Sequence, residues 1–122
     1  MKLDKTQILE KEWKTEAGLE AAVVIHPAGH RCGYVRMPAE HPYHGLGYDE
    51  MSICVHGGVT YSEEHDDGMW IGFDCAHYED APDPKFVNED FKMVFYKGGV
   101  VRTLEFCVEE CESIAKQLME KK

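Results

Sequence analysis

The fold is decided by one alternating stretch of the chain, Met69-Trp70-Ile71-Gly72-Phe73-Asp74-Cys75. Successive side chains of a β-strand point to opposite faces, so Ile71 and Phe73 belong to one face and Trp70 and Asp74 to the other. The first face is apolar throughout, whereas the second carries a carboxylate. This pattern predicts a strand that buries one side against a core and offers the other side to a ligand.

A second alternating stretch precedes it, Val55-His56-Gly57-Gly58-Val59-Thr60-Tyr61. We expect it to be the partner strand of a hairpin whose turn lies in residues 62–69. An even register then places His56 directly across from Asp74, with Cβ atoms about 4.5–5.5 Å apart. A carboxylate at that distance can orient the imidazole, so this pair is the first candidate site.

A second hairpin and two helices complete the expected elements. Residues 19–26 and 31–37 are rich in apolar residues and flank a turn at 27–30, which predicts two further strands. Residues 4–14 carry Ile8, Leu9 and Trp13 among charges, which favours a short amphipathic helix or turn. Residues 85–99 are ambiguous between a short strand and a helical turn.

The C-terminal segment predicts an amphipathic helix with Thr103 as its N-cap. Its apolar stripe follows i, i+3, i+4 spacing and comprises Leu104, Cys107, Val108, Cys111, Ile114, Ala115 and Leu118. We therefore expect a single α+β domain over residues 1–122, with an antiparallel sheet of about four strands in two hairpins. The helix would pack on the apolar face and leave the face of His56, Trp70 and Asp74 open.

Composition excludes several classes of function. The 122-residue chain has 13 Lys and Arg against 23 Asp and Glu, a formal net charge of −10. A phosphate backbone or an anionic membrane needs a basic face, so neither a nucleic-acid polymer nor a membrane surface is an expected partner. A small phosphate-bearing ligand needs only one or two cations or a few backbone amides. The chain carries no apolar run of membrane-spanning length, which predicts a soluble, cytoplasmic protein.

The five cysteines are odd in number and include no Cys-x-x-Cys pair. Neither a zinc ribbon nor a secreted disulfide framework is therefore expected. We interpret them as reduced thiols that serve as small buried side chains.

Several residues beside His56 and Asp74 suit a nucleotide-like ligand. The amides of Gly57 and Gly58 could cradle phosphate, and Arg102 could share an anion with the helix N-terminus. Trp70 and Tyr34 are the candidates for stacking on a base. The full set of expected ligand-binding residues is Tyr34, His56, Gly57, Gly58, Thr60, Trp70, Asp74 and Arg102.

A catalytic interpretation uses an overlapping set. His56 would be the general base or a metal ligand, Asp74 would orient it, and His77 with Asp80 would complete the site. Two histidines and a carboxylate also form a common metal set, although the spacing matches no dedicated metal signature. The competing structural interpretation makes the same side chains turn and capping groups.

These residues give the chain a resemblance to a group of small, uncharacterised bacteriophage and prophage proteins. The resemblance covers about residues 30 to 120. It rests on three stretches: His56-Gly57-Gly58-x-Thr60-Tyr61, residues 70–77, and residues 104–118. The last of these includes the run Glu110-Cys111-Glu112-Ser113-Ile114-Ala115-Lys116-Gln117-Leu118. No activity is established for the group, so it implies a context and no mechanism. Small phage proteins of this size often capture signalling nucleotides of bacterial defence, usually as oligomers.

Three functions stay open on the sequence. The first is binding of a small phosphate-bearing, nucleotide-like ligand, as a homodimer or higher oligomer in the cytoplasm of a bacterial host. The second is a small hydrolase or phosphoesterase with His56, Asp74 and His77 as catalytic residues. The third is a protein–protein inhibitor whose acidic surface docks on a basic partner.

Overall fold

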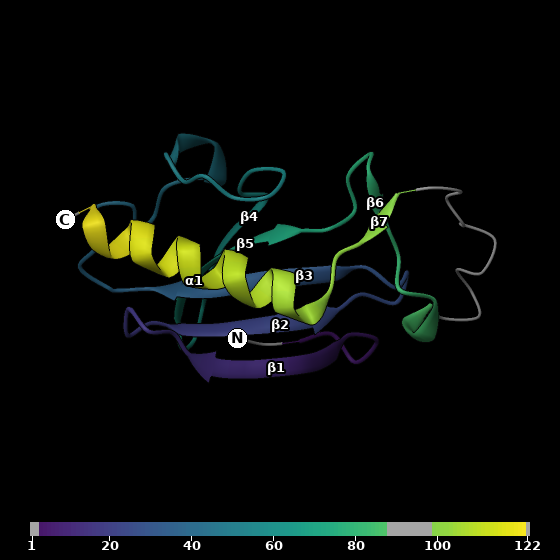
Figure 1. Cartoon of the computed structure of the whole chain (residues 1–122). Coiled ribbons are helices and arrows are strands. Elements are labelled where there is room, and N and C mark those ends of the chain that lie inside the picture. Colours follow the sequence, from purple (N-terminus) through teal and green to yellow (C-terminus); the bar gives the residue numbers. More distant parts are fainter. Residues whose placement is uncertain (1–2, 88–98, 122) are drawn as a thin grey trace.

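The computed structural model describes residues 3–87 and 99–121, which form a five-stranded antiparallel sheet and one long helix (Figure 1). The sheet order is β1-β2-β3-β5-β4. Its strands are β1 (Ile8–Lys14), β2 (Glu20–Ile25), β3 (Arg31–Met37), β4 (Tyr61–His65) and β5 (Gly68–Asp74). The remaining elements are α1 (Leu104–Glu120), the two-residue parallel pair β6 (Asp80–Ala81) and β7 (Val100–Val101), and the 3₁₀ turns η1 (Tyr48–Glu50) and η2 (Pro84–Phe86).

The predicted α+β class is confirmed, and so is the helix on one face of the sheet. Thr103 caps α1 by accepting a hydrogen bond from the amide of Phe106, and α1 lies across β3 and β2 (Figure 1). The apolar stripe of the helix is buried on β-strand residues of the predicted parity, including Val35, Ile71 and Phe73. The ambiguous segment 85–99 falls mostly outside the described residues.

The N-terminal prediction is wrong, because residues 8–14 form the edge strand β1 rather than a helix. The strand pairs with β2 along its whole length, from Ile8 opposite Ile25 to Lys14 opposite Glu20. A bulge between Leu9 and Lys11 shifts the side-chain alternation, so the apolar spacing imitates a helical period. Pairing with a buried neighbour overrides the weak local preference of this charged segment.

The predicted hairpin that contains Met69–Cys75 exists, but its register differs from the predicted one. Residues 55–60 are not a strand, because Gly57 and Gly58 adopt positive φ angles of 69° and 81°. The first strand is instead β4, which starts at Tyr61 opposite Gly72 and ends at His65 opposite Gly68. His56 therefore does not lie across from Asp74.

The segment before β4 runs along α1 and closes the core beside it. Gln117 of the helix both donates to the carbonyl of Cys54, at 2.7 Å, and accepts from its amide, at 2.8 Å. Glu110, two turns nearer the helix N-terminus, accepts from the amide of His56 at 2.8 Å. Val55 and Val59 pack against the core from this segment, as the sequence predicted. His56 thus faces the helix side of the sheet rather than an open face.

Within the described part of the chain, α1 and the short turns lack the length and apolarity of a membrane-crossing helix.

Candidate functional site

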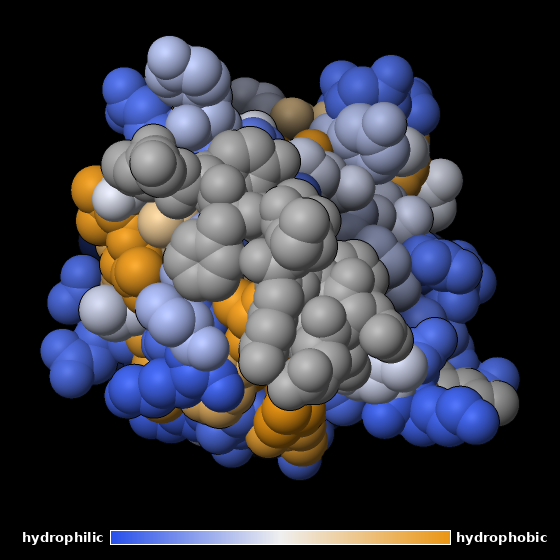
Figure 2. Space-filling model, turned by 90° about the vertical axis from the view of Figure 1, so that its right-hand side faces the viewer, coloured by the Kyte–Doolittle hydropathy of each residue, from blue (hydrophilic) through white to orange (hydrophobic). Residues whose placement is uncertain are grey.

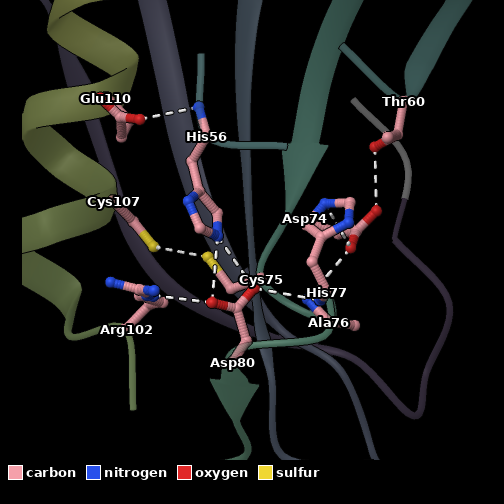
Figure 3. A network of polar contacts seen from close by, with 10 residues as sticks. All are labelled: His56, Thr60, Asp74, Cys75, Ala76, His77, Asp80, Arg102, Cys107 and Glu110. Atoms are coloured by element: carbon pink, nitrogen blue, oxygen red, sulfur yellow. Dashed lines mark hydrogen bonds and ion pairs between the residues drawn. The ribbon is translucent and has the colours of Figure 1, made fainter. Parts of the chain in front are cut away.

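The carboxylate of Asp80 is the centre of a polar network at the N-terminal end of α1 (Figure 3). Its Oδ1 accepts from Nε of Arg102 at 2.7 Å, and its Oδ2 accepts from the amide of His77 at 3.0 Å. Nε2 of His56 lies 2.8 Å from Oδ2 and 3.1 Å from Oδ1. Three segments that are distant in sequence therefore meet on one carboxylate.

The network keeps Asp80 ionised although its side chain is completely buried. Burial on its own raises the pKa of a carboxyl group, but the hydrogen bonds from Arg102, His56 and the His77 amide outweigh it. The net effect holds the pKa of Asp80 below its ordinary value. A buried carboxylate with this many donors has its charge neutralised locally, so the surrounding wall carries little net negative charge.

Arg102 reaches Asp80 from the residue just before the helix cap. Its guanidinium carbon lies 5.2 Å from the centre of the Phe106 ring, which fixes the side chain over the first turn of α1. Only Nε contacts Asp80, and the terminal nitrogens make no hydrogen bond to any described residue. Arg102 immediately precedes the N-cap residue Thr103, as the sequence predicted, and its Nε is bound to Asp80.

His56 is held on both sides. Glu110 binds its backbone amide, and its ring packs edge-on against Phe106 with centroids 5.2 Å apart. With Nε2 committed to Asp80, Nδ1 has no hydrogen-bond partner among residues 3–87 and 99–121. This is the arrangement of a histidine–aspartate dyad, in which the carboxylate fixes the tautomer and the second nitrogen is free to move a proton.

His77 provides the one polar side-chain atom in the described residues that is buried without a hydrogen bond, Nε2. Oδ1 of Asp74 lies 3.4 Å from this atom, an ion-pair distance that does not meet hydrogen-bond geometry. Gly57 packs so closely that a Cβ atom placed there would lie 2.0 Å from Nε2. The glycine at this position is therefore needed for the approach of His77 as well as for its positive φ angle.

A cavity of about 140 Å³ adjoins the network on the side of His77. Its lining consists of Ala28, His30, Cys75, Ala76, His77, Asp80 and Pro82. Burial lowers the pKa of His30, and the neighbouring imidazole of His26, stacked at 4.4 Å, lowers it further. His30 is thus neutral at neutral pH and can exchange a proton with a ligand.

Figure 2 views the molecule from this end, where hydrophilic residues occupy most of the coloured outline.

Most of the residues expected from the sequence are brought to this end of the sheet. His56, Gly57, His77 and Arg102 belong to the network itself. Asp74 lies beside it and accepts from the hydroxyl of Thr60 at 2.9 Å. Gly58 follows in the same turn, donating its amide to the carbonyl of Val55. The carboxylate that orients His56 is nevertheless Asp80 and not Asp74.

The two aromatic candidates do not join the site. Trp70 is only 2% exposed, and its indole nitrogen donates to Asp67 at 3.0 Å, so its ring is not free to stack on a base. Tyr34 packs edge-on against Tyr61 with centroids 5.1 Å apart. Its strand parity places it on the sheet face opposite α1. No stacking platform therefore adjoins His56 from these two residues.

Sequence reasoning missed His30 and Glu110 as parts of the site and gave Asp80 only a supporting role. The recurrence of ionisable side chains at Asp74, His77 and Asp80 did indicate that residues 74–80 belong to a site. The Gly57–Gly58 pair was the signal that the predicted strand breaks and that the register shifts.

Metal binding receives no support from the geometry. No group of three or more His, Cys, Asp or Glu side chains is placed to hold a metal ion, as far as the described residues extend. Neither a protein-family model, nor a curated protein, nor a solved structure matches this chain.

Proposed function

We propose that this protein binds a small phosphate-bearing, nucleotide-like ligand, with a phosphate group entering the cavity beside His77. The observation that carries the proposal is the gathering of His30, His56, His77 and Arg102 at one end of a strongly acidic chain. Histidine and arginine side chains are the usual donors to phosphate oxygens. Such a concentration of potential cations is unexpected for a purely structural turn.

The hydrogen bonds of Asp80 make anion binding compatible with a carboxylate in the wall of the cavity. Arg102 and His56 both bind Asp80, so His30 and His77 are the lining imidazoles that remain to meet an anion. His30 and His77 both line the cavity, so a phosphate oxygen that enters it would meet their rings.

The size of the cavity supports entry of one group rather than of a whole nucleotide. Sites that enclose a drug-sized molecule have volumes of about 300–1,000 Å³. A cavity of about 140 Å³ is smaller than that and suits a single phosphate, with the rest of the ligand outside.

Isothermal titration calorimetry with a nucleoside diphosphate such as ADP, and separately with inorganic phosphate, tests the proposal. We expect His77→Ala to weaken binding about tenfold or more, as loss of a charge-assisted hydrogen bond does. The exposed His44 at the opposite end of the sheet supplies the matched control, His44→Ala, which should bind as the parent does. Equal affinity of His77→Ala and parent, or no heat with either probe, would reject the proposal.

A second function is favoured by the His56–Asp80 dyad, namely hydrolysis of the bound phosphate ester or anhydride. Nδ1 of His56 would act as the general base for water, and Asp80 would stabilise the imidazolium that forms. Release of inorganic phosphate from ADP separates the two functions. Turnover that His56→Gln abolishes, while binding persists, supports the hydrolase; binding with no product leaves the first function alone.

The bacteriophage resemblance extends the proposal to a biological setting. There, the protein would sequester a signalling nucleotide of the bacterial host in the cytoplasm, as a homodimer or higher oligomer. Native mass spectrometry of protein purified from bacteria tests both parts, since it reports a co-purified nucleotide mass and the oligomeric state together.

A further inference from the structure

Two cysteines meet directly beneath the Asp80 network. Cys75 follows the last residue of β5, and Cys107 lies in the first turns of α1, with their Sγ atoms 3.6 Å apart (Figure 3). Formation of a disulfide would bring the two sulfurs from this contact distance to about 2.05 Å. No other sulfur–sulfur contact is seen among the described cysteines. Cys54 is exposed, Cys32 is buried on β3, and Sγ of Cys111 lies 3.9 Å from the carbonyl of Tyr34.

The two thiols differ in their access to solutes. Cys75 lines the 140 Å³ cavity, whereas Cys107 is completely buried and is absent from that lining. A molecule that reaches the cavity therefore meets Cys75 first, with Cys107 directly behind it. This order, a cavity-lining cysteine backed by a second that is fully buried, corresponds to an oxidisable cysteine and its resolving partner.

We propose that Cys75 and Cys107 form a reversible disulfide when a small peroxide enters the cavity. The Cys75 thiolate attacks one peroxide oxygen, the O–O bond breaks, and Cys75 becomes a sulfenic acid with release of one water. Cys107 then attacks the sulfenic sulfur, loses its proton, and the S–O bond breaks as a second water leaves. Two thiols are oxidised and one hydrogen peroxide is reduced to two waters.

The surroundings make this reaction slow and base-dependent. The hydrogen bond with Cys107 and burial both raise the pKa of the Cys75 thiol far above its ordinary value, so little thiolate is present at neutral pH. The rate should therefore rise about tenfold per pH unit through the neutral and mildly alkaline range. The exposed Cys54 should react before the pair does.

The disulfide would lock the end of β5 to α1. It closes a loop of about 30 residues, and removal of that loop entropy from the unfolded chain should raise the Tm by on the order of 10 °C. Because the link lies under Asp80, oxidation would also fix the wall of the cavity.

The test begins from Cys54→Ala, which removes the exposed thiol and its intermolecular disulfides. Folded protein is treated with hydrogen peroxide, then unfolded, alkylated and mapped by mass spectrometry. We expect a loss of about 2 Da, linkage of the peptides that contain residues 75 and 107, and a higher Tm that dithiothreitol reverses. Oxidised glutathione, which is too large for the cavity, should not produce the link in folded protein.

Two further variants test whether Cys107 is the partner of Cys75. In the Cys54→Ala background, Cys107→Ala should abolish the 2 Da loss, whereas Cys111→Ala, one turn along the same buried stripe, should retain it. Full alkylation of all buried thiols after peroxide, or a link that survives Cys107→Ala, would overturn the proposal. So would accumulation of sulfinic acid at Cys75 without any linkage.

Discussion

The two ends of α1 cover the same sheet face by different means. Toward the C-terminus, Ile114, Ala115 and Leu118 lie completely buried against apolar strand residues. Toward the N-terminus, the same face is closed by Asp80 and its three donors. The apolar end is held by packing, which has no directional requirement, whereas the polar end is stable only while each buried group keeps its partner.

The difference explains where a ligand site can arise. Among the described residues, no buried side-chain nitrogen or oxygen at the apolar end lacks a hydrogen bond. At the polar end, Nε2 of His77 is buried without one, and His77 lines a cavity. A buried polar atom without a hydrogen-bond partner stabilises the protein further when a ligand supplies that partner. Substitutions at the apolar end should therefore lower stability more than ligand binding, and substitutions at the polar end should lower ligand binding more than stability.

The largest effect on stability is expected at the apolar end, from Ile114→Ala. Ile114 is completely buried, and truncation of such a side chain costs about 3–4 kcal/mol through lost transfer energy and the cavity that remains. Urea denaturation measures the loss. Ligand affinity of the folded fraction should not change, and a large loss of affinity would show that the two ends are not independent.

At the polar end, Asp80→Asn should destabilise by about 3 kcal/mol, because it leaves Arg102 and His56 without the charge that they share. The pKa of Asp80 is lowered in the folded state, so its contribution is present above the ordinary value of 3.8 and disappears as pH falls through the folded pKa. Urea midpoints of parent and variant should thus converge below about pH 4. The adjacent exposed residue gives the control, Glu79→Gln, which should show neither the loss nor the convergence.

Two neighbouring glycines separate backbone strain from site geometry. Gly57→Ala and Gly58→Ala both place a Cβ at positive φ and should each cost about 1–2 kcal/mol. Only at Gly57 does the added atom collide with His77, since Gly58 has open space around it. Calorimetric titration should show weaker phosphate binding in Gly57→Ala alone. Equal affinity in the two variants would mean that His77 does not act in binding.

The smallest expected effect is the pH dependence of His30. Its pKa is lowered in the folded state, so the unfolded chain binds the extra proton first. The free energy of unfolding should decline as pH falls below about 6.5, by no more than about 1 kcal/mol per pH unit. The decline should end once the pH is below the pKa of His30 in the folded state. Thermal melts between pH 5 and 8 should show this slope in the parent and a shallower one in His30→Gln. An unchanged slope would place the titration elsewhere.

Periodicity predicted much of the fold because burial imposes it. The alternation of Ile71 and Phe73 and the stripe from Leu104 to Leu118 correctly gave a strand, a helix and the faces that meet. Residues 8–14 were mispredicted because an exposed edge strand has little apolar alternation. The bulge between Leu9 and Lys11 also shifts the alternation that remains. Pairing with β2 is a long-range interaction that no local pattern contains.

The site was less predictable, because its geometry depends on where a strand stops. His56 was recognised, but its partner was assigned by assuming that residues 55–61 continue a regular strand. The turn at Gly57 and Gly58 ends that regularity and sends His56 toward α1, where Asp80 meets it. Alternation likewise placed Trp70 on an open face, whereas the folded chain buries it.

Imidazole NMR spectra of the seven histidines during titration with ADP test the central claim most directly. We expect the resonances of His30 and His77, which line the cavity, to shift most as ADP binds. Those of His41, bonded to the carbonyl of Leu118, and of the exposed His44 should stay unchanged. Shifts confined to His41 or His44, or no shift at saturating ADP, would contradict a phosphate site at the Asp80 end.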